Sequence, residues 1–369
     1  MSSPMTSHPF LPSFGNRPHH IIGRTGITKD FLEGLRLPPG HKKRSTILIG
    51  QRGTGKTTLL LEFEQLAQQA DYVPARVTAN DEMMDEIVQA IQANGVQYIP
   101  DSRPKIKGVA AGALGFSFGL TFSEAAEAQY GHRFKLSMLC DELAKQDKGV
   151  LILVDEVRPN TPEIRSLATT YQHLVGEGKN IAIAMAGLPN SMSAVLSDDI
   201  LTFLNRAHKI HLQPLPLPEV SIAYSGELLK QSKAIAPSDL SRATEATRGY
   251  PYLYQLIGYY LLQYAQDSES VTADMVDNAI HTSKLEMTDS IFHAVLKPLS
   301  NKDLDFLKAM SADKEESTIA DIEERMQASK ALVQRYRGRL IEAGIIASTG
   351  TGRLAFTVPF LGEYLRGDF

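Results

Sequence analysis

The sequence has almost no cysteine, no excess of positive charge and no long hydrophobic run, and each shortage excludes a class of protein. Cys140 is the single cysteine in 369 residues, so a disulfide framework is excluded and a reducing, cytoplasmic location fits. Lys and Arg number 38 against 42 Asp and Glu, which argues against a surface coated in positive charge for nucleic acid. No stretch reaches the roughly 18 apolar residues of a transmembrane helix, and residues 1–20 lack the apolar core of a signal peptide. We therefore expect a cytoplasmic protein that does not span a membrane, with any nucleic-acid contact confined to a local basic face.

Shifts of pattern along the chain predict four segments. Residues 1–19, rich in Ser, Pro and His, read as a flexible tail. Residues 20–214 alternate short apolar runs with helical patterns, which is typical of a parallel α/β core. Leu215-Pro216-Leu217-Pro218 marks a stiff connector, and residues 215–297 are predicted to form a helical lid with a break at Gly249-Tyr250-Pro251. The predicted strands of the core cover residues 46–49, 73–77, 150–154, 181–186 and 209–212.

The last segment, residues 298–369, predicts a winged helix-turn-helix. Helices are expected at 301–310, 318–326 and 329–343, followed by strands at 345–346 and 354–358 around a glycine-bearing turn. A further strand is expected at Leu114–Phe122, where apolar and small residues alternate. That strand could pack on the core or offer a contact surface to a partner or another subunit.

A phosphate-binding loop is the most specific motif in the sequence. Residues 50–57 match G-x-x-x-x-G-K-[ST], and they follow a predicted strand and open a predicted helix. The glycines permit close approach of backbone N–H groups to phosphate, and the helix N-terminus adds partial positive charge. Lys56 supplies a charge for the β- and γ-phosphates, and the Thr57 hydroxyl suits Mg²⁺. The predicted ATP-binding residues of this loop are Gly50, Gln51, Arg52, Gly53, Thr54, Gly55, Lys56, Thr57 and Thr58.

The second half of the predicted site is the end of the apolar run Val150–Val154. A buried strand here would deliver Asp155 and Glu156 to the sheet edge that carries the phosphate loop. Asp155 would hold Mg²⁺ together with Thr57, and Glu156 would orient or deprotonate the attacking water. An acidic turn after a core strand is the competing interpretation.

These motifs resemble those of the AAA+ and STAND-type P-loop ATPases, near the origin-recognition-like branch. Asp155-Glu156 looks like the Walker B pair, and Ile181–Gly187 resembles the sensor 1 strand, with Asn190 as the nearby polar candidate. Phe203–Ala207 looks like the arginine-finger region, which implies that Arg206 acts on a neighbouring subunit of a homo-oligomer. A surface arginine paired with a local carboxylate is the alternative for Arg206.

The same resemblance assigns residues around the adenine. Ile22, Gly23 and Arg24 look like the family motif beside the base, and Pro251 resembles the lid proline that faces it. The family places a sensor 2 arginine early in the following helix, whereas residues 252–260 contain none. Arg248 is the nearest arginine to that position.

The third helix of the C-terminal segment is predicted to be a recognition helix for duplex DNA. Its apolar stripe leaves two basic rows on other faces, and one arginine lies in the wing. The predicted DNA contacts are Lys330, Gln334, Arg335, Arg337, Arg339 and Arg353. Nearby acidic residues offset this charge, so a module that only packs on the ATPase core or on a protein partner is the alternative.

Together these features predict an ATP-binding and ATP-hydrolysing switch that couples nucleotide state to the winged helix. A DNA-loading or transposition-type ATPase that assembles on DNA is a second hypothesis. A regulatory module that binds ATP without hydrolysing it is a third.

Overall fold

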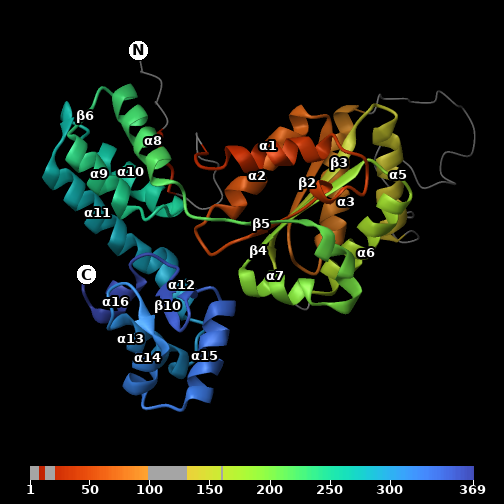
Figure 1. Ribbon diagram of the computed structural model, residues 1–369. Helices are drawn as coiled ribbons and strands as arrows, with labels where there is room; N and C mark the ends of the chain where they lie inside the picture. The colour runs from red at the N-terminus through yellow and green to blue at the C-terminus, as the bar shows by residue number, and fades with distance from the viewer. Residues whose placement is uncertain (1–7, 13–20, 99–130, 159–160) are drawn as a thin grey trace, which may run out of the picture.

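A five-stranded parallel sheet lies at the centre of the N-terminal half of the chain (Figure 1). The computed structural model describes residues 8–12, 21–98, 131–158 and 161–369. The sheet has the order β2-β3-β4-β1-β5, and every neighbouring pair is parallel. Its strands are β1 (Ser45–Ile49), β2 (Tyr72–Thr78), β3 (Gly149–Val157), β4 (Ile181–Gly187) and β5 (His208–His211). All five predicted strands are therefore present, and no end differs from the expected one by more than three residues.

Helices cover both faces of this sheet, which explains why the central strands are apolar throughout. Alternate residues of β3 face opposite sides: Ile152 packs in one buried cluster and Leu153 in the other. Pro74 is tolerated in β2 because that strand lies at the edge of the sheet and pairs only with β3. The covering helices are α1 (Thr25–Leu35), α2 (Lys56–Gln69), α3 (Met83–Gly95), α5 (His132–Ala144), α6 (Pro162–Gly176) and α7 (Pro189–Leu196). The predicted α/β fold of the core is confirmed.

The connector after β5 leads to a helical region, here called the lid. It contains α8 (Leu217–Lys230), α9 (Pro237–Ala246), α10 (Pro251–Tyr264) and α11 (Ala273–Met287), with a two-stranded sheet of β6 (Ala234–Ile235) and β7 (Ser270–Val271). Proline stands in the first turn of α8, α9 and α10, where its missing N–H costs nothing and its fixed φ suits a helix. The predicted break at Gly249–Pro251 separates α9 from α10.

Residues 8–12 pack against this lid, which differs from the predicted free tail. Phe10 is only 1% exposed, and its ring meets Tyr224 and Tyr254 edge-on, with centroids 5.7 and 5.5 Å away. The Leu11 N–H donates to Gln255 at 2.9 Å. Because Gly258 has no side chain, the Phe10 ring can lie directly against its backbone. The composition of the segment did not reveal this single anchoring residue.

The C-terminal elements follow the predicted order of three helices and a hairpin. A π-helical turn (Thr288–Phe292) and α12 (His293–Leu296) lead into α13 (Asn301–Ser311), β8 (Ser317–Thr318), α14 (Ile319–Met326), α15 (Lys330–Glu342), β9 (Ile346–Gly350), β10 (Arg353–Phe356) and α16 (Leu361–Arg366). The strands form an antiparallel sheet of order β8-β10-β9. One apolar cluster joins these elements to Tyr250, Leu253 and Met287 of the lid, so packing does not break at the proposed boundary of residue 298.

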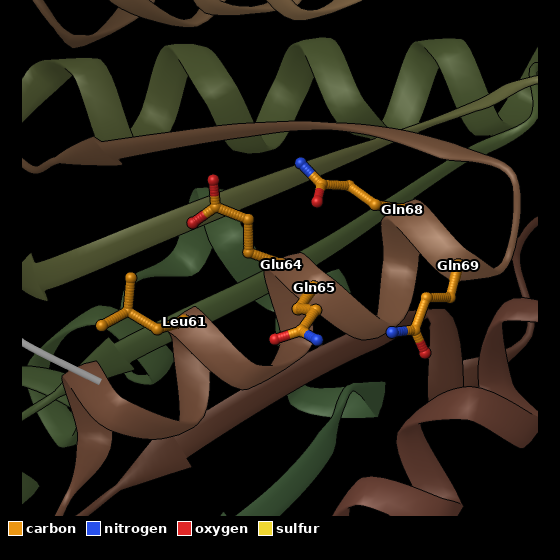
Figure 2. Close-up of a pocket in the computed structure, with 5 residues that line it drawn as sticks. All are labelled: Leu61, Glu64, Gln65, Gln68 and Gln69. Carbon is orange, nitrogen blue, oxygen red and sulfur yellow. The ribbon is translucent and has the colours of Figure 1, made fainter. Parts of the chain in front are cut away.

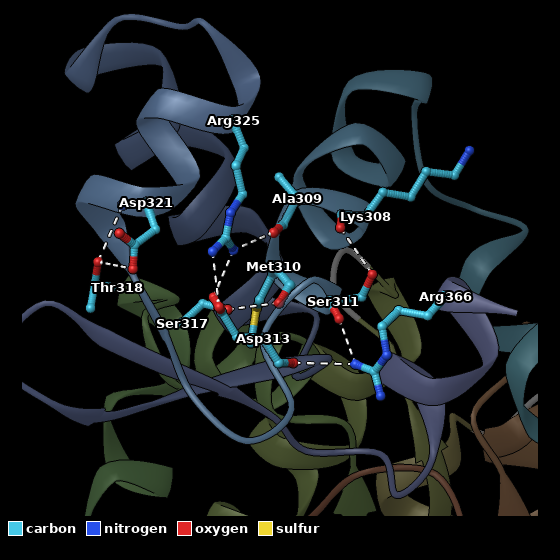
Figure 3. Close-up of polar contacts among 10 residues, drawn as sticks. All are labelled: Lys308, Ala309, Met310, Ser311, Asp313, Ser317, Thr318, Asp321, Arg325 and Arg366. Carbon is cyan, nitrogen blue, oxygen red and sulfur yellow. Dashed lines mark hydrogen bonds and ion pairs between the residues drawn. The ribbon is translucent and has the colours of Figure 1, made fainter. Parts of the chain in front are cut away.

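Two arginines fix the turn that follows α13 (Figure 3). Arg325 of α14 forms a two-pronged ion pair with Asp313, at 2.6 and 2.9 Å, and donates to the Ala309 carbonyl. Arg366 of α16 donates to the carbonyl oxygens of Ser311 and Asp313. These bonds tie three helices to one turn, so neither arginine is available to a ligand.

The predicted strand Leu114–Phe122 lies outside the described residues. Among the helices that the structure does describe, none combines the length and apolar character needed to cross a bilayer.

Candidate functional site

The loop between β1 and α2 presents a row of unused backbone donors. Gly53 and Gly55 have φ angles of +72° and +86°, which a side chain would disfavour. The N–H groups of residues 51–55 make no hydrogen bond to any other described residue. Successive unpaired N–H groups that precede a helix N-terminus form a concave site for an anion. This is the backbone geometry that the glycine pattern predicted.

The Lys56 ammonium lies over the same loop. Its Nζ donates to the carbonyl oxygens of Gly50 at 3.0 Å and Gln51 at 2.7 Å. Burial lowers the pKa of Lys56 from 10.5 to about 8; the carboxylate of Asp155 opposes this shift, and the Arg52 guanidinium adds to it. A phosphate group would supply negative charge to this half-buried cation.

Thr57 and Asp155, the two predicted metal ligands, meet directly. The Thr57 hydroxyl donates to Asp155 Oδ2 at 2.6 Å, and the Glu156 N–H donates to Oδ1 at 2.8 Å. Asp155 is 8% exposed and stands at the carboxyl end of β3, two strands from β1. A hydroxyl and a carboxylate in contact are oxygen donors of the kind that Mg²⁺ prefers. The described residues contain no cluster of three or more acidic, His or Cys ligands, so a Mg²⁺ ion here would need phosphate and water oxygens to complete its shell.

Glu156 adopts an unusual backbone conformation. Its φ is +51°, a region that non-glycine residues enter infrequently. The carboxylate is exposed and pairs with Arg158 at 3.2 Å. Reorientation of this side chain, with loss of the Arg158 contact, would be needed before it could act on water at the phosphate site.

The predicted adenine-side residues gather at the boundary between core and lid. Arg24 is buried and donates to the Gln213 carbonyl at 2.7 Å, and burial lowers its pKa. The Gly23 N–H donates to Glu219 at 2.8 Å, and Ile22 packs against the apolar cluster of the lid. A Cβ placed on Gly55 would lie 3.9 Å from Pro251, so the lid proline stands beside the phosphate loop.

Asn190 and Arg206 lie at opposite ends of the sheet. Asn190, exposed at the start of α7, lines a cavity of about 550 Å³ together with Gln51 and Arg52 of the phosphate loop. Arg206 precedes β5, which runs parallel to β1 from His208 beside Thr46. Because the phosphate loop follows the other end of β1, Arg206 is at the edge of the sheet that faces away from its own loop. It is exposed and makes no ion pair with another described residue.

The same cavity is lined by both the phosphate loop and the C-terminal segment. Its walls include Ser300, Asp303, Arg339 and Gly344 as well as the loop. The Gln51 side chain lies against Gly344, in the space where a Cβ would stand. Arg248, the nearest arginine to the sensor 2 position, pairs with Glu363 of α16 at 2.7 Å and is not directed to the loop. Sequence reasoning missed the Gln51–Gly344 contact, for which the sequence carries no local signal.

Tyr250 is the other residue that sequence reasoning missed. Its hydroxyl donates to the Arg52 carbonyl, and its ring covers Gly53. The only sequence signal was its position between the glycine and proline of the lid turn.

A second hollow shares no lining residue with this cavity (Figure 2). It is lined by one face of α2: Leu61, Glu64, Gln65, Gln68 and Gln69. No charged cluster or buried polar atom in it indicates a ligand.

Comparison with known proteins supports the fold. A family model described as a domain of unknown function (DUF8462) matches residues 289–365, and no curated protein gives a significant match. The Walker-type ATPase of Pyrococcus abyssi is 15% identical with a TM-score of 0.68, covering 95% of this chain and 97% of its own. The ORC2 protein of Aeropyrum pernix, solved as ADPNP–ADP complexes, is 15% identical with a TM-score of 0.66, covering 96% and 94%. Cdc6p from Pyrobaculum aerophilum is 17% identical with a TM-score of 0.50, covering 96% of each chain.

These likenesses extend over nearly the whole chain. At such low identity they concern the fold, which is that of the ORC- and Cdc6-type P-loop ATPases.

Proposed function

We propose that the chain binds ATP with Mg²⁺, hydrolyses it slowly, and couples its nucleotide state to the C-terminal segment. The observation that carries this proposal is the row of unpaired N–H groups at residues 51–55, next to a half-buried lysine and a joined hydroxyl–carboxylate pair. Unpaired donors that precede a helix N-terminus can exchange their water for an anion, which they then bind together. The fold, shared with an ORC2 protein solved with ADPNP and ADP, is consistent with a nucleotide as that anion.

In this proposal each part of the site has one task. The loop N–H groups and Lys56 hold the β- and γ-phosphates, and Lys56 exchanges its present carbonyl partners for phosphate oxygens. Thr57 and Asp155 hold Mg²⁺, which neutralises charge that develops on the phosphates. Glu156 orients the attacking water, and Asn190 contacts the γ-phosphate side of the site. Ile22, Gly23, Arg24 and Pro251 enclose the adenine.

Arg206 is proposed to act on the nucleotide of a second copy of the chain. Its position at the far edge of the sheet excludes action on its own phosphate loop, because four residues of β5 extend roughly 13 Å and the arginine lies beyond them. An arginine supplied in trans accelerates phosphoryl transfer by about a thousandfold or more. The monomer is therefore expected to be a slow ATPase, and oligomers to be the active form.

Coupling to the C-terminal segment has two supporting contacts. Gln51 of the phosphate loop touches Gly344, which follows α15. Glu363 of α16 pairs with Arg248 at 2.7 Å and with Lys284 at 2.7 Å, so lid and C-terminal segment are linked by charge as well as by a shared apolar cluster. Movement of the loop around a nucleotide would disturb the first contact, while the second would make the lid and C-terminal segment move together.

The C-terminal segment is proposed to be a winged helix that contacts duplex DNA. Helices α14 and α15 are joined by three residues, and β9 and β10 form the wing. Lys330 and Arg335 are exposed and form no ion pair with described residues, which suits contact with phosphate. Arg339 is bound to the buried Asp303, and Arg353 pairs with Glu316 at 3.3 Å, so these two are weaker candidates than the sequence suggested. Gln334 accepts from Arg337 at 3.4 Å, which orients both along α15.

The central experiment measures nucleotide binding and hydrolysis with matched variants. Wild-type protein should bind ATP in calorimetry, whereas Lys56→Ala should lose most of that affinity. Lys145→Ala, which removes an exposed lysine at the C-cap of α5, serves as the control. Glu156→Gln should bind ATP normally but hydrolyse it far more slowly. Normal ATP affinity of Lys56→Ala would overturn the proposal, and binding without any turnover by wild type would favour the regulatory module.

Duplex DNA separates the remaining hypotheses. The ATPase rate is measured with and without DNA, together with molecular mass in ATP and in ADP. Stimulation by DNA with growth in mass would favour an ATPase that assembles on DNA. DNA affinity should fall as salt rises, because phosphate contacts release counterions; affinity that ignores salt would contradict DNA contact through Lys330 and Arg335.

A further inference from the structure

Tyr250 joins the lid to the phosphate loop through one peptide group. Its hydroxyl donates to the carbonyl oxygen of Arg52. A Cβ placed on Gly53 would lie 2.6 Å from this hydroxyl and 2.7 Å from the ring, so the ring is in contact with the loop backbone. Arg52 and Tyr250 are 198 positions apart in the sequence. The contact is therefore a tertiary link between two of the segments that the proposed nucleotide site needs.

The tyrosine is held firmly on the lid side. It is 5% exposed and occupies the N-cap position of α10. Its N–H donates to the Thr247 carbonyl at 2.8 Å, and the neighbouring Gly249 carbonyl accepts from the Leu215 N–H at 2.6 Å. Thr247 is itself completely buried. These contacts therefore hold the turn, and with it the Tyr250 ring, in a fixed position.

The consequence for the loop follows from peptide geometry. The described residues contain no cis peptide bond, and in a trans peptide the C=O and N–H groups point in opposite directions. When the hydroxyl holds the Arg52 carbonyl, the N–H of Gly53 is turned away from the tyrosine. Glycine at position 53 could otherwise rotate freely, because it populates both signs of φ.

We propose that Tyr250 is a positioning residue that fixes the Arg52–Gly53 peptide so that the Gly53 N–H remains presented to a phosphate group. The inference rests on the proposed function only for the identity of that phosphate, the β-phosphate of ATP or ADP. It also gives the lid a defined role, because opening the lid would release this peptide and weaken the phosphate site.

The test removes one oxygen atom. Tyr250→Phe retains the ring and loses the donor. The matched control is Tyr252→Phe, which removes a hydroxyl from the same helix that interacts with Ser290 instead. Loss of a single neutral hydrogen bond should weaken ADP binding about threefold to tenfold. Binding of AMP, which has no β-phosphate, should change little, and the control variant should bind both nucleotides like wild type.

An NMR correlation reports directly on the Arg52–Gly53 peptide. Protein labelled with ¹³C-carbonyl arginine and ¹⁵N-glycine gives NMR correlations only from Arg–Gly pairs. The sequence contains four: Arg52–Gly53, Arg248–Gly249, Arg337–Gly338 and Arg366–Gly367. In nucleotide-free Tyr250→Phe the Arg52–Gly53 correlation should shift or broaden, while the last two pairs stay unchanged as internal references.

The outcomes separate this inference from the proposed function. An unchanged Arg52–Gly53 signal in Tyr250→Phe would overturn the positioning role, as would wild-type affinity for ADP in that variant. If wild-type protein binds no ADP, the proposed function fails, but the nucleotide-free spectrum still decides whether Tyr250 orients the peptide. A shifted signal together with a selective loss of ADP affinity would support both.

Discussion

Replacing Lys56 by methionine should stabilise the folded protein at neutral pH. Burial lowers the pKa of this ammonium from 10.5 to about 8, and that difference corresponds to about 3 kcal/mol. The folded state is destabilised because it must hold a proton that the unfolded chain binds more tightly. Methionine keeps most of the length of the side chain and carries no charge. Lys56→Met should therefore unfold with a free energy up to about 3 kcal/mol higher than wild type at pH 7.

The stability difference between Lys56→Met and wild type should depend on pH. Between pH 8 and 10.5 the unfolded chain binds more protons at this lysine than the folded protein does, so wild-type stability rises with pH through that window. The difference in unfolding free energy between Lys56→Met and wild type should thus shrink to about 2 kcal/mol at pH 9. It should approach zero above pH 10.5, the pKa of this lysine in the unfolded chain. Urea unfolding of both proteins at several pH values, without nucleotide, measures this difference directly.

Nucleotide binding should restore the charge of Lys56. At pH 8.5 a lysine with a pKa of about 8 has lost its proton in roughly three quarters of the molecules. A bound triphosphate would raise that pKa again, so binding should take up about 0.7 proton. Calorimetry in buffers of different ionisation enthalpy counts these protons. Two results would refute the reasoning: a stability difference that stays constant with pH, or ATP binding at pH 8.5 without proton uptake.

Three other predictions concern residues other than Lys56. Phe10→Ala should lower the free energy of unfolding by about 3 kcal/mol or more, because it empties a site enclosed by lid aromatics; unchanged urea unfolding would mean that the segment does not anchor there. Gly344→Ala should cost about 1–2 kcal/mol, since φ is +67° and the methyl group would displace Gln51; an unaltered melting temperature would contradict that geometry. Arg206→Ala should abolish the rise of specific ATPase activity with protein concentration while ATP affinity is retained. Mixing it with Lys56→Ala, which keeps the arginine, should restore activity, and no restoration would count against action in trans.

Local pattern predicted the core well because its signals are short-range. Apolar runs such as Val150–Val154 must be buried on both faces. A G-x-x-x-x-G-K-[ST] loop between such a strand and a helix is typical of phosphate binding. The pairing of Thr57 with Asp155 followed from the rule that parallel strands end at the same edge. The C-terminal order of helices and hairpin was likewise legible from periodicity and glycine positions.

Other features needed the tertiary structure. Composition suggested that residues 1–19 are a free tail, yet Phe10 is buried in the lid. Charge spacing placed Arg339 on a DNA-facing row, whereas Asp303, 36 residues earlier, binds it. In both cases the partner is far along the chain, so no window of sequence reveals it.

The sequence by itself determined the parallel core, the glycine-bearing loop after β1 and the acidic strand end, since each depends on residues that are neighbours in the chain or on the alternation of one strand. Only the tertiary structure decided that Tyr250 and Gln51 connect this loop to the lid and to the C-terminal segment. Those contacts join residues roughly 200 to 300 positions apart. Such contacts form only after separate hydrophobic faces have packed, and local propensity does not record which distant backbone group a hydroxyl or an amide will meet.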